Sequence, residues 1–262
     1  MRVLVTGAAR AIGAATAQVF LEQGWEVVAT ARRPERLEDV PATLRLPLDV
    51  TDEASVRACV DQAGPVDVLV NNAAISEPGP LERYPLDRFS AVLDTNVVGA
   101  LRMVQAVVPG MRERGSGAIV NVSSVNGRVA SPLGGAYAAS KFALEAVSET
   151  LHFELGHFGI RIVVIEPGFI APGMKPGTAW GMEPPYDELQ RQWTGADSSL
   201  LAGEGRPGAE LVGQAILRAV TTDEPKLRWP VGADAELVLG TRAALDDAAF
   251  EAAMRETLDL TW

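Results

Sequence analysis

The sequence predicts an α/β fold in which a doubly wound, mainly parallel sheet of seven strands is covered by helices. Short β-rich runs alternate with longer segments of helical periodicity, which is typical of this fold class. Runs such as Ile162-Val163-Val164-Ile165 are continuously apolar, as expected for parallel strands buried on both faces. With 262 residues, 47% of them hydrophobic, the chain can bury a full core. We expect one domain over residues 1–262.

The expected strands follow one another at residues 2–6, 25–31, 44–48, 66–70, 118–122, 160–165 and 226–231. The expected helices lie between them at residues 11–23, 51–63, 87–114, 137–156 and 209–220. Gly24 is typical of a helix C-terminus, and Thr51 is expected to be the N-cap of the second helix. The local signals therefore agree with the periodic ones.

Residues 169–207 interrupt this alternation and predict a lid over the substrate. The segment is too long for an ordinary connection and leaves the sheet at its carboxyl end, where ligands of α/β proteins bind. It has few charges before Asp187, and its aromatic side chains Trp180, Tyr186 and Trp193 are candidate substrate contacts. The alternative is that these side chains only pack the loop or meet a neighbouring subunit.

Composition excludes several classes of partner. The chain has 23 Lys and Arg against 34 Asp and Glu, a net charge of -11, which repels nucleic acids and anionic lipids. Cys59 is the single cysteine, and no apolar stretch approaches the roughly 20 residues of a membrane span. His152 and His157 are five residues apart, so they do not share a helix face and predict no metal site. We expect a cytoplasmic protein.

A glycine-containing turn joins the first strand to the first helix. This order brings backbone N–H groups and a helix N-terminus to the carboxyl end of the sheet, which favours a bound pyrophosphate. A glycine turn alone is often only a turn. The candidate cofactor-binding residues in it are Thr6, Gly7, Arg10, Ala11, Ile12 and Gly13.

The end of the second strand indicates which dinucleotide is bound. Sites for NAD usually have an acidic residue there, whereas this chain has Ala31 followed by Arg32 and Arg33. Together with Arg10, these guanidinium groups suit the 2′-phosphate of NADP(H) through charge-assisted hydrogen bonds. The alternative is that they are solvated surface charges.

Tyr137 and Lys141 are four residues apart on a predicted helix and therefore lie on one face. A phenol with a pKa of about 10 exchanges protons poorly at neutral pH, unless a nearby ammonium group stabilises the phenolate. Such a pair is common by chance, so its meaning depends on the surrounding motifs.

Those motifs are Thr6-Gly7 with Gly13, Asp49, Asn71-Asn72-Ala73-Ala74, Asn96, Ser124, Tyr137 with Lys141, and Pro167-Gly168. In order and spacing the chain resembles the single-domain short-chain dehydrogenase/reductases from Arg2 to about Gly168. The resemblance implies a Rossmann-like fold and an NADP(H)-dependent oxidoreductase acting on a ketone or a secondary alcohol.

The resemblance also implies a role for each catalytic residue. Tyr137 would exchange a proton with the substrate oxygen, and Ser124 would hydrogen-bond the same oxygen. Lys141 would lower the pKa of Tyr137 and hold the nicotinamide ribose. Asn96 would kink its helix and hold a water molecule of the proton relay. Ser123 is the competitor of Ser124, but the spacing of 13 residues to Tyr137 favours Ser124.

For the cofactor, the resemblance assigns the adenine amino group to Asp49. The remaining expected cofactor contacts are Val50, Asn72, Ala73, Tyr137, Lys141, Pro167, Gly168 and Ile170. Three positions depart from the family pattern: Ala11 and Ala74 replace glycines, and Ala171-Pro172 replaces a threonine near the carboxamide. The methyl group of Ala11 stands where the backbone approaches the pyrophosphate most closely.

Two other functions are weighed. A non-catalytic NADP-binding sensor or scaffold needs only the phosphate-binding end, and the complete set of Asn96, Ser124, Tyr137 and Lys141 argues against it. A sugar-nucleotide epimerase or dehydratase usually has a larger C-terminal domain than the residues after Gly168 allow. We expect a medium-sized hydrophobic substrate and, from the family, a homodimer or homotetramer.

Overall fold

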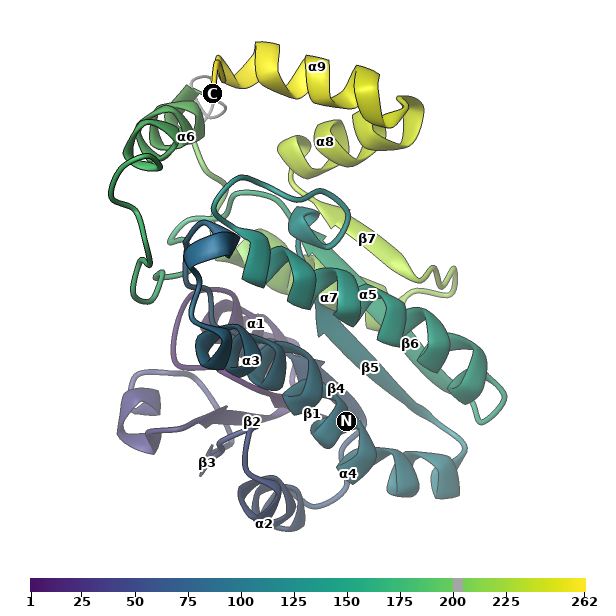
Figure 1. Cartoon of the computed structure of the whole chain (residues 1–262). Helices are drawn as coiled ribbons and strands as arrows, with labels where there is room; N and C mark the ends of the chain where they lie inside the picture. The colour runs from purple at the N-terminus through teal and green to yellow at the C-terminus, as the bar shows by residue number, and fades with distance from the viewer. Residues whose placement is uncertain (200–204) are drawn as a thin grey trace.

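The computed structural model describes residues 1–199 and 205–262, and its strands form one sheet (Figure 1). The strand order is β3-β2-β1-β4-β5-β6-β7, and every neighbouring pair is parallel. The predicted doubly wound, seven-stranded sheet is thus confirmed. The strands are β1 (Arg2–Val5), β2 (Glu26–Ala31), β3 (Leu44–Pro47), β4 (Val68–Asn71), β5 (Gly117–Val122), β6 (Ile160–Pro167) and β7 (Arg228–Val231).

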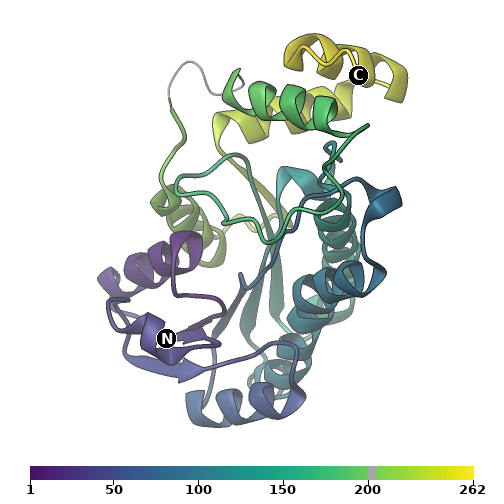
Figure 2. The ribbon, with the colours of Figure 1, turned by 60° about the vertical axis from the view of Figure 1, so that its left-hand side comes forward.

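Helices cover both faces of the sheet, as Figure 2 shows. They are α1 (Ala11–Glu22), α2 (Glu53–Ala63), α3 (Leu86–Leu93), α4 (Gly99–Arg114), α5 (Gly135–Gly156), α6 (Asp187–Ser199), α7 (Ala209–Thr221), α8 (Ala233–Ala244) and α9 (Asp247–Leu258). Successive residues of a strand point to opposite faces, so the sheet has two cores. Val3 and Val5 pack with α1 and α7, whereas Leu4 packs in the core that α2, α4 and α5 complete.

Three helices were not predicted from the sequence: α6, α8 and α9. All three lie at one end of the molecule, away from the layers that cover the sheet (Figures 1 and 2). Only Ala235 of α8 and Leu258 of α9 are fully buried, so neither helix needs the broad apolar stripe by which helices are found in a sequence. The sequence therefore carried little periodic signal for them.

Two details of the predicted helices were wrong. The N-cap of α2 is Asp52, whose Oδ1 accepts a hydrogen bond from Ala54 N at 2.8 Å, and not Thr51. Thr51 Oγ1 instead donates to Asp49 Oδ1 at 2.7 Å. The expected helix at residues 87–114 is divided into α3 and α4 by a π-helical turn at Asp94–Val98.

This divided run, Leu86–Arg114, is long and apolar enough to span a membrane by length and composition alone. That differs from the expectation that no stretch approaches this length. In the fold its α4 part contributes Met103, Val104, Val107 and Met111 to the core beside the sheet. Packing against the sheet therefore accounts for its apolar character.

A buried chain of polar side chains links the central strands to α5. Asn71 Nδ2 on β4 donates to Asn121 Oδ1 on β5 at 2.9 Å, and Asn121 Nδ2 donates to Ser148 Oγ on α5 at 2.8 Å. The Ser148 hydroxyl in turn donates to Leu144 O at 2.6 Å. These bonds fix α5 relative to the middle of the sheet.

We predict that Ser148→Ala lowers the free energy of unfolding by about 1 to 3 kcal/mol, because it leaves the buried Asn121 amide without its acceptor. Ser90→Ala is the matched control: its hydroxyl makes the same bond to a carbonyl one turn earlier, Leu86 O, but on an exposed surface. That change should cost about 0.5 kcal/mol or less. Denaturant unfolding measures both, and equal losses would contradict a role for the buried chain.

Candidate active site

A continuous cavity of about 1140 Å³ lies along the carboxyl ends of the strands. Its walls come from the turn after β1, the ends of β2, β4, β5 and β6, and the segment that follows β6. Small-molecule sites usually have volumes of about 300 to 1,000 Å³. The cavity therefore has room for a large cofactor and a second molecule.

The turn between β1 and α1 has two positions that only glycine fits. Gly7 has a φ of 66°, and a Cβ on it would lie 2.9 Å from Ala73 Cα. A Cβ on Gly13 would lie 2.5 Å from Gly7 O. Thr6 Oγ1 accepts hydrogen bonds from Asn72 N at 2.9 Å and Ala73 N at 3.0 Å. Thr6 and Gly13, which were predicted to bind the cofactor, thus shape the turn, while Gly7 itself lines the cavity.

Ala11, at the expected glycine position, keeps the left-handed backbone conformation with a φ of 46°. This conformation costs a residue with a Cβ atom about 1 to 2 kcal/mol. Arg10 precedes α1 without a side-chain capping bond, so the N–H groups of the first turn stay available to a ligand. Arg10, Ala11 and Ile12 all line the cavity.

Four guanidinium groups line this end of the cavity. Arg10, Arg32 and Arg33 were predicted, and Arg36 joins them from the short 3₁₀ helix Pro34–Leu37. Arg36 was missed, although it follows Arg32 by four residues and lies two residues after Pro34, which starts a helical turn. All four side chains are exposed, so an anion can reach them.

Asp49 lies at the same end. Burial acts to raise the pKa of this carboxyl group, but hydrogen bonds from Thr51 and the charges of Arg32 and Arg102 outweigh it and lower the pKa. Asp49 is therefore a charged acceptor beside the arginines. Val50, Asn72 and Ala73 line the neighbouring wall, as predicted.

Ser124, Tyr137 and Lys141 meet on the wall of the same cavity. Tyr137 is hydrogen-bonded to Ser124, and Lys141 Nζ lies 5.5 Å from the centre of the Tyr137 ring. Lys141 Nζ donates to Val122 O at 2.7 Å. The three predicted side chains are thus brought together from the end of β5 and the first turns of α5.

The pKa values of this group differ from the expectation. Burial raises the pKa of Tyr137 to about 12, although the hydrogen bond from Ser124 acts to lower it. Burial lowers the pKa of Lys141 to about 8, although the charge of Glu145 acts to raise it. Burial of the phenol has the largest effect, so the pKa of Tyr137 lies above its ordinary value. Tyr137 therefore carries its proton at neutral pH.

The structure separates the two neighbouring serines. Ser124 Oγ caps a short 3₁₀ turn by accepting from Asn126 N at 3.2 Å and also contacts Tyr137. Ser123 is 3% exposed, and its hydroxyl has no hydrogen-bond partner among the residues that the structure describes. The geometry favours Ser124 as the residue that acts with Tyr137.

Asn96 lies in the π-helical turn that divides α3 from α4. Its Oδ1 accepts from Ile75 N at 2.8 Å, and its Nδ2 donates to Ile75 O and to Ser140 Oγ, both at 2.9 Å. Thr95, the preceding residue, lines the cavity. The Asn96 side chain does not line the cavity and is buried against Ile75 and Ser140. Asn96 thus joins the segment after β4 to α5.

The segment after β6 is closed at its base and pinned along its length. Ala171 N donates to Pro207 O at 2.8 Å, and Ala209 N donates to Ala171 O at 3.0 Å. Farther along, Gly177 N donates to Ser76 O at 2.7 Å. Part of the predicted lid at 169–207, residues 200–204, lies outside the described residues.

Of the three predicted substrate contacts on this lid, only Trp193 lines the cavity. Trp180 packs beside Tyr84, and its Nε1 donates to the buried Glu77 carboxylate at 2.9 Å. Tyr186 stacks near Trp262, with 6.0 Å between the ring centres. Trp180 and Tyr186 do not line the cavity, and each has a partner outside it, which agrees with the alternative that these side chains pack the loop.

The remaining lining on the lid side is mostly apolar. Gln190 and Thr194 join Trp193 from α6 and were missed because that helix was not predicted. Pro167, Gly168 and Ile170 line the cavity, as predicted, and Phe169 N is held by Asp234 Oδ2 of α8 at 2.6 Å. The other apolar lining residues from the lid are Phe169, Pro172, Met174, Pro176, Ala179 and Met182.

Among the described residues, no three His, Cys, Asp or Glu side chains are grouped so that they could hold a metal ion. The chemistry that the cavity offers is instead a phenol, a hydroxyl and an ammonium group next to an arginine-rich, anion-accepting end. This combination suits proton transfer beside a bound dinucleotide.

Comparisons with known proteins agree with this site. A family model described as short chain dehydrogenase matches residues 1–179. The 3-ketodihydrosphingosine reductase of Bacteroides thetaiotaomicron is 34% identical over 236 residues, which cover 88% of this chain and 87% of that protein.

Two solved structures are similar over nearly the whole chain. A short-chain dehydrogenase from Streptomyces avermitilis has a TM-score of 0.82 and 32% identity, and the match covers 98% of this chain and 96% of the other. A short chain dehydrogenase from Burkholderia cenocepacia, in complex with NADP, has a TM-score of 0.78 and 27% identity, with 97% and 96% covered. The chain therefore belongs to the short-chain dehydrogenase/reductase family and is an oxidoreductase.

Proposed function

We propose that this protein is an NADP(H)-dependent oxidoreductase that interconverts a ketone and a secondary alcohol. The observation that carries the proposal is the meeting of Ser124, Tyr137 and Lys141 on the wall of a cavity whose other end is lined by arginines. A sensor or scaffold would need only the arginine-lined end.

The residues present fit NADP(H). Gly7 and Gly13 let the turn pack tightly against the protein, Gly7 lines the cavity, and α1 begins there without a side-chain cap. Arg10, Arg32 and Arg33 would hold the 2′-phosphate, in the position where Ala31 replaces the usual acid. When bound, the reduced cofactor supplies the hydride. The Burkholderia relative that was solved with NADP supports this assignment.

The proton chemistry follows from the protonated state of Tyr137. Its hydroxyl would give a proton to the carbonyl oxygen while the carbonyl carbon is reduced, and Ser124 would hydrogen-bond the same oxygen. The phenolate that is left would be stabilised by the Lys141 ammonium group beside the ring. In the oxidative direction, Tyr137 would take the proton back from the alcohol.

A medium-sized hydrophobic substrate fits the lid side of the cavity. Met174, Met182 and Trp193 offer apolar surface there. The name of the Bacteroides relative, a reductase of a ketodihydrosphingosine, also supports an apolar ketone.

The cellular location and the assembly stay predictions. We propose a cytoplasmic protein that forms a homodimer or homotetramer through α4 and α5. The exposed Phe142 and Phe153 on α5 support such an association, and the molar mass in solution would test it.

We predict that Arg32→Ala weakens NADPH binding by about tenfold or more and leaves NADH binding nearly unchanged, because one charge-assisted bond is worth about 1.5 to 3 kcal/mol. Titration of cofactor fluorescence measures both constants. Arg57→Ala removes an equally exposed arginine on α2, paired with Glu53, and should change neither. Equal catalytic efficiency of the parent with NADPH and NADH would contradict the cofactor assignment.

We predict that Tyr137→Phe lowers turnover by about 10² to 10⁴ and leaves the dissociation constant of NADPH near the parent value, because only the proton donor is removed. Tyr186→Phe changes a tyrosine outside the cavity and should keep full turnover. The assays are loss of NADPH absorbance and a binding titration. Near-normal turnover of Tyr137→Phe would exclude the assigned role.

We predict that Trp193→Ala raises KM for bulky apolar ketones by about tenfold or more, since a large apolar side chain contributes about 1.5 to 3 kcal/mol when buried. KM for small polar carbonyls should hardly change. Leu86→Ala, at an 81% exposed position on α3 outside the cavity, is the control. If the parent reduces small polar carbonyls best and Trp193→Ala has no effect, the substrate class is wrong.

A further inference from the structure

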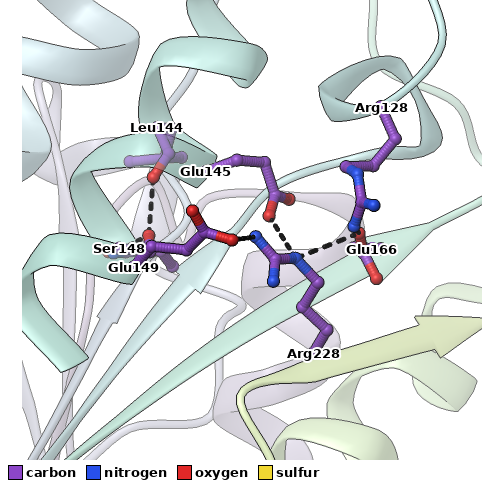
Figure 3. A network of polar contacts seen from close by, with 8 residues as sticks. Arg128, Leu144, Glu145, Ser148, Glu149, Glu166 and Arg228 are labelled. Atoms are coloured by element: carbon purple, nitrogen blue, oxygen red, sulfur yellow. Dashed lines mark hydrogen bonds and ion pairs between the residues drawn. The ribbon is translucent and has the colours of Figure 1, made fainter. Parts of the chain in front are cut away.

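A buried network of charged side chains joins α5 to β6 and β7 and has no part in the mechanism above (Figure 3). Its members come from three elements: Glu145 from α5, Glu166 from β6 and Arg228 from β7. Glu145 is 4% exposed and Glu166 is 1% exposed. Two carboxyl groups buried this deeply require partners or a proton.

Arg228 does not serve the two carboxyl groups equally. Its Nε donates to Glu145 Oε2 at 2.9 Å but lies 3.9 Å from Glu166 Oε1. Its Nη2 donates to Glu149 Oε1 at 2.6 Å, nearer the surface. The second cation near Glu166, Arg128 Nη1, is 3.7 Å away and half-exposed. Glu145 thus has a short charge-assisted hydrogen bond, whereas Glu166 has only longer ion-pair contacts.

Each of the two carboxyl groups also has a buried oxygen that lacks a hydrogen-bond donor among the described residues. Glu166 Oε1 and Glu145 Oε1 are buried without a hydrogen-bond partner among the described residues. Burial and the charge of Glu145 raise the pKa of Glu166 to about 7, although Arg128 and Arg228 act to lower it. When two close carboxyl groups compete for one cation, the less well bonded one takes the proton. Here that group is Glu166.

Glu145 lies one helical turn after Lys141 on α5, so both side chains leave the same face. The hydrogen bond of Lys141 goes to a neutral acceptor, Val122 O. Of the surrounding charges, Glu145 is the one that offsets the effect of burial on the pKa of Lys141. The backbone closes tightly here: a Cβ on Gly127 would lie 3.0 Å from Glu145 Cγ.

We propose that Glu145 is a positioning residue that keeps the buried Lys141 side chain in its ammonium form, and that Glu166 takes up the proton that would otherwise neutralise Glu145. Arg228 holds Glu145 in place. Glu149 and Arg128 lie at the outer edge of the network, and Asp234 of α8 is bonded to Phe169 N. The effect of Glu145 on the charge of Lys141 does not depend on the proposed function. Only the effect of that charge on catalysis rests on it.

The sign of the effect follows from the charges. Removing the negative charge at position 145 destabilises the ammonium form of Lys141, so its pKa falls below about 8. The amine then loses its proton at a lower pH. The alkaline limb of the pH profile of kcat/KM would move in the same direction.

The test is a pH titration of ligand-free protein carrying ¹³Cε-labelled lysine, followed by NMR. The chain has three lysines, Lys141, Lys175 and Lys226, so the spectrum is simple, and Lys226 is identified by its position over the Trp229 ring. Glu145→Gln should lower the Lys141 midpoint by about one pH unit. Glu145→Asp, which keeps the charge, should restore most of the parent midpoint.

Glu149→Gln is the matched control, because it removes a carboxylate that shares Arg228 but is 53% exposed on its side chain. It should leave the Lys141 midpoint within about 0.3 units, since exposed charges are screened. An unchanged midpoint in Glu145→Gln would overturn the proposal.

Glu166→Gln tests the proposal independently of whether Glu145→Gln folds. Glu145, and not Glu166, is the charge that acts on the pKa of Lys141, so the neutral isostere at position 166 should shift the Lys141 midpoint by less than about half a unit. A shift of a full unit would assign the role to Glu166 and overturn the proposal. The titration needs no substrate, so a protein without reductase activity would refute the proposed function and still test Glu145.

Discussion

The parallel pairing of β1 with both β2 and β4 is the constraint on which the rest of the molecule depends. Parallel strands need crossover helices, and the chain turns in opposite directions on the two sides of β1, so both faces of the sheet become covered. The turns at the carboxyl ends then diverge and leave a crevice. The glycine turn after β1, the arginines after β2 and the serines after β5 meet there because this strand order brings their ends to one edge.

The sequence predicted what is repeated or strongly patterned. The strands, the sheet-covering helices and the positions of Ser124, Tyr137 and Lys141 follow from apolar periodicity and motif spacing. It did not predict features that depend on one distant partner. Trp180 was predicted to contact the substrate because the sequence does not show that its N–H donates to Glu77, about a hundred residues earlier. Likewise, Arg36 reaches the cavity only because a single helical turn directs it there.

Local and global charge have opposite signs in this protein. The chain carries a net charge of -11, yet the described lining of the cofactor end includes four arginines and Asp49. An anion is thus repelled by most of the surface and attracted at the cleft, which concentrates binding at one place. One helical turn after Lys141 on the same face of α5, the buried Glu145 carboxyl group lies outside the cavity lining, in the network with Glu166 and Arg228.

The closed base of the lid has a consequence for substrate binding. Ala171 pairs with the backbone beside Gly208, and Gly177 and Trp180 are bonded to the segment after β4. The entropy of closing this long loop is therefore lost when the chain folds, and substrate binding does not have to supply it again. On a preorganised wall, the contacts that a ligand makes are not offset by the cost of ordering the loop. Selectivity between substrates then depends on the shape of the wall more than on its ability to rearrange.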